Sequence, residues 1–116
     1  MRGAWLVLPL ALAGCGVVPA QTSQAARRHV VEMKAFGFEP AQLQVQAGDT
    51  VEFVNRDAVP HTATATDQAW NTGQIEAGAS GMWIVAGVGE QSYYCIFHPT
   101  MKGKLEVGKG QSKREG

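Results

Sequence analysis

Residues 93–104 read Tyr-Tyr-Cys-Ile-Phe-His-Pro-Thr-Met-Lys-Gly-Lys, and they place a thiol, an imidazole and a thioether within seven residues. The side chains that carry this chemistry are Cys95, His98 and Met101. A loop with this spacing can fold all three around one point. Thiolate and thioether are soft ligands, and cysteine with two histidines and a weak, distant methionine suits copper better than zinc, calcium or magnesium. We therefore interpret this stretch as most of a copper site.

The interpretation needs a second imidazole, which the chain supplies earlier as His61, at the end of Asn-Arg-Asp-Ala-Val-Pro-His. His61 opens an expected strand that could pair near the loop. Taken singly, each candidate has an ordinary explanation, since cysteine and methionine commonly fill cores and a surface histidine commonly has no role. The chain has three histidines, and two of them occur where a copper site requires them. The combination therefore favours a metal site.

The loop Cys-Ile-Phe-His-Pro-Thr-Met, residues 95–101, resembles the ligand loop of the small blue copper proteins, the cupredoxins. Two residues separate Cys from His and two separate His from Met, a spacing most similar to that of the amicyanins. Pseudoazurins and plastocyanins are also similar along the chain but have a longer gap between His and Met. The similarity extends from Phe38 to Val107.

The resemblance implies a carrier of single electrons between redox partners, without enzymatic activity. It implies one type 1 copper ion, Cu(I) or Cu(II), with the ligands His61, Cys95, His98 and Met101. Asn55 would tie the strand of His61 to the cysteine loop.

The resemblance also implies that electrons pass through the exposed edge of His98. A redox donor and acceptor would dock briefly on the apolar residues around it, Pro60, Phe97 and Pro99, because electron-transfer encounters use small interfaces. We expect a monomer.

The remaining sequence predicts one all-β domain, residues 29–108, folded as a Greek-key antiparallel β-sandwich of the cupredoxin-like kind. Residues 42–46 alternate polar and apolar side chains, and residues 47–49, Ala-Gly-Asp, are typical of a turn. No run has helical spacing, and short strands separated by turn residues favour a sandwich. The expected strands are residues 29–35, 42–46, 50–55, 61–66, 79–86, 91–97 and 103–107. We expect the core to contain Phe36, Phe53, Trp70 and Trp83, with Met33 and Met82 as filler.

The N-terminus reads as a secretion signal over residues 1–15, with a positive Arg2, a short apolar run and small residues. Leu-Ala-Gly-Cys, residues 12–15, is similar to a bacterial lipobox, in which Cys15 would carry the lipid. Cleavage after Ala20 is the alternative. Residues 16–28 read as a flexible tether, His29 as a solvated residue and 109–116 as a polar tail. We expect a periplasmic or otherwise extracytoplasmic protein, attached to a membrane only through this lipid.

The charges exclude a nucleic-acid partner, because ten basic and ten acidic residues give no net charge and no basic stripe. A copper chaperone or storage protein is the main alternative function, although such sites tend to be richer in Met or His. A fragment of a copper oxidase or nitrite reductase would need further histidines, and His29 alone remains. Zinc is disfavoured because methionine is a poor zinc ligand.

Overall fold

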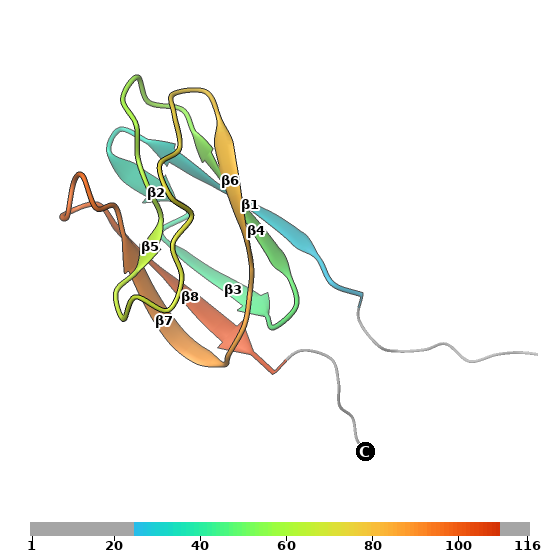
Figure 1. The fold of residues 1–116 in the computed structure, drawn as a ribbon. Coiled ribbons are helices and arrows are strands. Elements are labelled where there is room, and N and C mark those ends of the chain that lie inside the picture. Colours follow the sequence, from blue (N-terminus) through green and yellow to red (C-terminus); the bar gives the residue numbers. More distant parts are fainter. Residues whose placement is uncertain (1–24, 110–116) are drawn as a thin grey trace, which may run out of the picture.

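The computed structural model describes residues 25–109, so the expected signal, lipobox and most of the tether and tail lie outside the described residues (Figure 1). The described chain forms strands, and none of it belongs to a helix that could cross a bilayer. The strands are β1 (Arg28–Lys34), β2 (Gly37–Glu39), β3 (Gln42–Gln46), β4 (Thr50–Asn55), β5 (Thr64–Ala65), β6 (Ser80–Ile84), β7 (Gly89–Tyr94) and β8 (Lys102–Gly108).

The strands form two four-stranded sheets with the orders β2-β1-β4-β6 and β3-β8-β7-β5, which pack as a sandwich (Figure 1). The predicted all-β sandwich is confirmed, but the sheets are mixed rather than purely antiparallel. β1 pairs with β4 in parallel, and β3 pairs with β8 in parallel. Parallel neighbours need a crossover connection, and the chain between β1 and β4 provides one because it visits the other sheet as β3.

Two strand predictions were too long at the end of the molecule that holds the candidate ligands. The run expected at 61–66 is reduced to β5, and His61 forms only an isolated bridge with Ile75. The strand expected at 91–97 ends as β7 at Tyr94. Residues 95–101 therefore form the loop that connects β7 and β8, outside the strand ladder.

The core between the sheets is aromatic and lies directly beneath this loop. Phe53 stacks beside Trp70, and Trp70 stacks on Trp83 with ring centroids 4.1 Å apart. Tyr93 lies opposite Gly103 in the β7–β8 ladder, and a Cβ at residue 103 would come within 2.3 Å of the tyrosine ring. Glycine at 103 thus lets the tyrosine ring lie against the backbone of β8 just where the loop ends.

The core predictions were right for Phe53, Trp70 and Met33, which are buried, and Trp83 packs against them from a partly buried position. They were wrong for Phe36, which is 52% exposed, and for Met82, which is 56% exposed. Hydrophobicity alone did not distinguish these residues from core residues, because their exposure is set by a turn and by an outward-facing strand position.

Candidate metal centre

Two predicted ligands, His61 and Cys95, come together in the interior although 34 positions separate them. The Nδ1 atom of His61 lies 3.7 Å from the Sγ atom of Cys95, and both residues have no exposed surface. Nitrogen and thiolate ligands on one metal ion, at bond lengths of about 2.0 and 2.3 Å with tetrahedral to trigonal angles, lie roughly 3.5–3.7 Å apart. The pair therefore has the separation that a shared metal ion requires.

The sulfur of Cys95 receives a hydrogen bond from the backbone. The N–H of Thr62 donates to Sγ over 3.3 Å, and within residues 25–109 the Cys95 thiol is free of any disulfide. This bond links the cysteine sulfur to the residue that follows His61. Such bonds also tune a metal–thiolate centre.

The imidazole of His61 is oriented by a carboxylate. Its Nε2 atom donates to Oδ2 of Asp57 over 2.8 Å, and its Nδ1 atom faces the sulfur of Cys95. Burial raises the pKa of Asp57, but hydrogen bonds from His61 and from the amides of Phe36 and Ala35 outweigh burial and hold the pKa below its ordinary value. The aspartate therefore remains ionised and fixes the ring as a supporting residue does in metal sites.

Asn55 does not make the contact that the resemblance implied. Its side-chain amide donates to the carbonyl oxygens of Val59 and Ile75, and so braces the segment before His61. Thr62 joins the segment of His61 to the cysteine loop instead. Its Oγ1 accepts a hydrogen bond from the N–H of Ile96 over 3.0 Å, and its own N–H donates to the sulfur of Cys95. The signal in the sequence was the position of Thr62 directly after the candidate ligand His61.

The ligand loop closes on itself through its backbone. The N–H of His98 donates to the carbonyl of Cys95, the N–H of Met101 donates to the carbonyl of His98, and the N–H of Cys95 donates to the carbonyl of Met101. These distances lie between 2.8 and 3.2 Å. Met101 is 2% exposed, so its side chain is buried at the end of the loop.

His98 joins the pair by ring contact, with its centroid 5.2 Å from that of His61 at an interplanar angle of 77°. It is half-buried, and no residue within 25–109 hydrogen-bonds its imidazole. Over the same range, no three His, Cys, Asp or Glu side chains are already closed around one point. The structure therefore supplies a preformed His61–Cys95 pair with His98 beside it.

The surface around His98 is apolar. Exposed hydrophobic side chains come from three segments that meet at the histidines, and they are Phe36, Val59, Ile96 and Phe97. The sequence prediction named Phe97 but missed the other three. Val59 precedes Pro60, and Ile96 lies within the ligand loop, so both could have been found from their position beside predicted ligands.

The donor set fits copper: a buried thiolate, a buried imidazole with its Nδ1 available, a second imidazole at the surface and a buried thioether. Zinc is less suited to this set because a closed structural zinc site takes four nitrogen or thiolate ligands. The residues present thus match the metal that the sequence predicted.

The family match, the sequence relative and the solved structures that resemble this chain all point to the cupredoxins. Residues 5–107 match the family model of the cupredoxin-like domain. Amicyanin of Paracoccus denitrificans is 28% identical over 107 residues, which cover 84% of this chain and 82% of the relative.

Among solved structures, a purple cupredoxin from Nitrosopumilus maritimus has a TM-score of 0.64 at 26% identity, covering 69% of this chain and 99% of that one. A methionine-to-alanine variant of amicyanin with Cu(I) has a TM-score of 0.63 at 26% identity, covering 76% and 87%. The fold is therefore shared with these cupredoxins.

Proposed function

Since this chain belongs to the cupredoxin-like family, whose members usually carry electrons through a blue copper site, we propose that it is a single-electron carrier. One copper ion would be held by His61, Cys95, His98 and Met101. The bound ion supplies the chemistry, a reversible change between Cu(II) and Cu(I). The protein has no substrate of its own in this proposal.

The observation that carries the proposal is the His61–Cys95 pair. A separation of 3.7 Å between Nδ1 and Sγ, in a site without exposed surface, fits two ligands of one ion. The Thr62 amide donates to the cysteine sulfur, and Asp57 orients the imidazole. The first bond reaches the proposed donor atom itself, and the second acts through the opposite nitrogen of the ring.

The same hydrogen bonds limit movement at the site. Copper prefers different geometries in its two oxidation states, and a scaffold that hardly moves lowers the reorganisation at each electron transfer. Thr62 joins the two ligand-bearing segments, and the loop from Cys95 to Met101 is closed by its own backbone bonds. The inner ligands thus have few ways to relax.

Electron exchange would occur at the half-buried edge of His98. Exposed Phe36, Val59, Ile96 and Phe97 give this end an apolar surface suited to brief contact with a redox protein, because weak electron-transfer complexes use small interfaces. The formal charge of zero gives no reason to expect a strongly charged partner. We further propose an extracytoplasmic location, with a lipid on Cys15 as the anchor.

Copper delivery or storage is the second candidate, and the arrangement of His98 favours it. Of the two proposed imidazole ligands, His98 is the half-buried one, and its imidazole has no hydrogen bond within residues 25–109. A ligand held in this way could leave the metal during transfer to another protein.

The test is the visible and EPR spectrum of the protein loaded with Cu(II) and titrated with a reductant. We expect an intense blue band and a narrow copper hyperfine splitting, both lost reversibly on reduction. Cys95→Ser should abolish the band because thiolate-to-copper charge transfer is lost. Cys15→Ser is the matched control, since these are the two cysteines of the chain.

A pale, ordinary Cu(II) spectrum in the unmodified protein would reject the electron-carrier proposal and favour copper delivery. A blue band that persists in C95S would remove Cys95 from the site.

A further inference from the structure

The turn between β1 and β2 holds an unusual backbone. Lys34 pairs with Gly37, so the turn consists of Ala35 and Phe36, and both have positive φ, 52° and 57°. Turns of this kind strongly prefer Asn and Gly, and a bulky residue in the left-handed region is a genuine outlier. Strained residues persist when their surroundings determine them, and they cluster at functional sites.

A carboxylate of the candidate metal centre holds this turn in place. Oδ1 of Asp57 accepts the N–H of Ala35 over 2.8 Å, and Oδ2 accepts the N–H of Phe36 over 3.0 Å. The same Oδ2 atom accepts the Nε2–H of His61 over 2.8 Å. One side chain therefore ties the strained turn to a proposed copper ligand.

The ring that the turn presents contacts both imidazoles. Phe36 meets His98 with centroids 4.7 Å apart and His61 with centroids 5.4 Å apart, each at an interplanar angle of 82°. Edge-to-face contacts of this kind are favourable beyond the area they bury. Phe36 is nevertheless 52% exposed, so it lies between the imidazoles and solvent.

The two imidazoles differ in what else holds them. His61 has Asp57 on Nε2, whereas no residue within 25–109 hydrogen-bonds the imidazole of His98. Phe36 therefore packs on the His98 ring on the side that faces solvent.

We propose that Phe36 is a positioning residue that holds the His98 imidazole against His61 and covers the metal from solvent. Asp57 sets the cover in place through the strained turn. The cover slows the entry of small solutes to bound copper and its escape. This inference rests on the copper site of the proposed function and adds a residue that controls access to it.

The test is the rate at which EDTA withdraws copper from the full, copper-loaded protein. Bound copper is measured by atomic absorption after rapid desalting, so that the readout does not depend on the blue band. Phe36→Asn suits the backbone, because Asn tolerates positive φ, and it removes the ring. We expect copper release about tenfold faster, consistent with losing two edge-to-face ring contacts.

Three further variants make the result specific to the ring. Phe36→Tyr keeps the ring and should release copper at the rate of the unmodified protein. Phe36→Leu keeps an apolar side chain without a ring and should be as fast as F36N, which also covers the case in which F36N fails to fold. Met82→Asn removes a similarly exposed apolar side chain from β6 and should leave the rate unchanged.

If F36N or F36L releases copper at the same rate as the unmodified protein, the proposal that Phe36 covers the metal is wrong. Equally fast release from F36Y or M82N would overturn it too, because the effect would then not belong to the ring. The proposed function fails separately: a protein that binds copper without a blue band is not an electron carrier of this kind, yet its release rates still test Phe36.

Discussion

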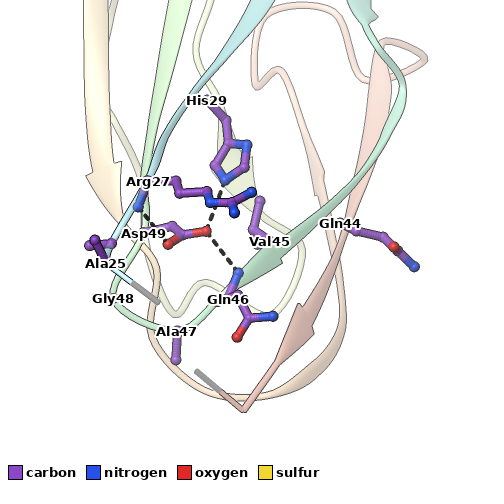
Figure 2. A pocket seen from close by; sticks show the side chains of 10 residues that line it. Ala25, Arg27, His29, Gln44, Val45, Gln46, Ala47, Gly48 and Asp49 are labelled. Carbon is purple, nitrogen blue, oxygen red and sulfur yellow. Dashed lines mark hydrogen bonds and ion pairs between the residues drawn. The ribbon is translucent and has the colours of Figure 1, made fainter. Parts of the chain in front are cut away.

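Two aspartate–histidine pairs lie at opposite ends of the parallel strands β1 and β4, and they are built alike. Nε2 of His29 lies 2.8 Å from Oδ2 of Asp49, and Nε2 of His61 lies 2.8 Å from Oδ2 of Asp57. Each carboxylate also accepts two backbone amides, those of Arg27 and Gln46 at one end and of Ala35 and Phe36 at the other. Figure 2 shows the first pair, with Asp49 directed at His29 and at the start of the turn after β3.

The difference lies in the surroundings of the second ring nitrogen. His61 is fully buried with Nδ1 3.7 Å from the sulfur of Cys95. His29 has a side chain 19% exposed and borders a pocket lined by small and polar residues (Figure 2). The same unit thus joins two strands at one end and orients a proposed metal ligand at the other. The sequence prediction of His29 as a solvated residue was wrong, because its ring pairs with Asp49. Among residues 25–109 the cysteine is Cys95, which lies at the opposite end.

Replacing each histidine in turn should give the largest difference between the two aspartate–histidine pairs, and the difference should appear in the blue band. His61→Ala should abolish the blue band of the copper-loaded protein, because the buried partner of Cys95 is lost. His29→Ala should keep the band at full intensity. The check is the visible spectrum at matched copper content. A normal blue band in H61A would end the functional distinction between the pairs.

Replacement of the aspartates should affect both ends in stability but one end in redox chemistry. Asp57→Ala and Asp49→Ala each remove the acceptor of two backbone amides and one imidazole and should lower the free energy of unfolding by about 2–3 kcal/mol. D57A alone should also shift the reduction potential, since supporting residues tune the metal. Urea denaturation of the copper-free proteins and redox titration of the loaded ones measure the two effects. A shifted potential in D49A would mean that the two ends are coupled.

The smallest expected effect is on the pH dependence of stability, and it concerns the pair of Asp49 and His29. Burial raises the pKa of Asp49, but hydrogen bonds from the Arg27 amide, His29 and the Gln46 amide outweigh it and lower the pKa below its ordinary value. A lowered folded-state pKa stabilises the protein above the unfolded value of about 4, and this contribution disappears as pH falls through the folded pKa.

Asp49→Asn should therefore weaken the loss of stability between neutral pH and pH 3. The measurement is urea denaturation of copper-free protein across that range, with the unmodified protein as reference. An unchanged pH profile would show that Asp49 does not contribute through its charge.

The sequence predicted what depends on local spacing. Cys95, His98 and Met101 share one loop because few residues separate them, and the alternation in residues 42–46 and 50–55 gave β3 and β4 correctly. The parallel pairings were missed because alternation indicates which face is buried and says nothing about the direction of a partner strand. The roles of Thr62 and Phe36 were missed because each depends on a tertiary contact, a sulfur in one case and two imidazoles in the other.

The ligand loop depends little on the sandwich for its shape. Apart from the bond between the Ile96 amide and Thr62, the hydrogen bonds of its backbone join Cys95, His98 and Met101 to one another. A change in the residues between His98 and Met101 would leave the β7–β8 ladder intact. Mutations between His98 and Met101 can therefore change the surroundings of the proposed metal site, while the two sheets continue to fold as before.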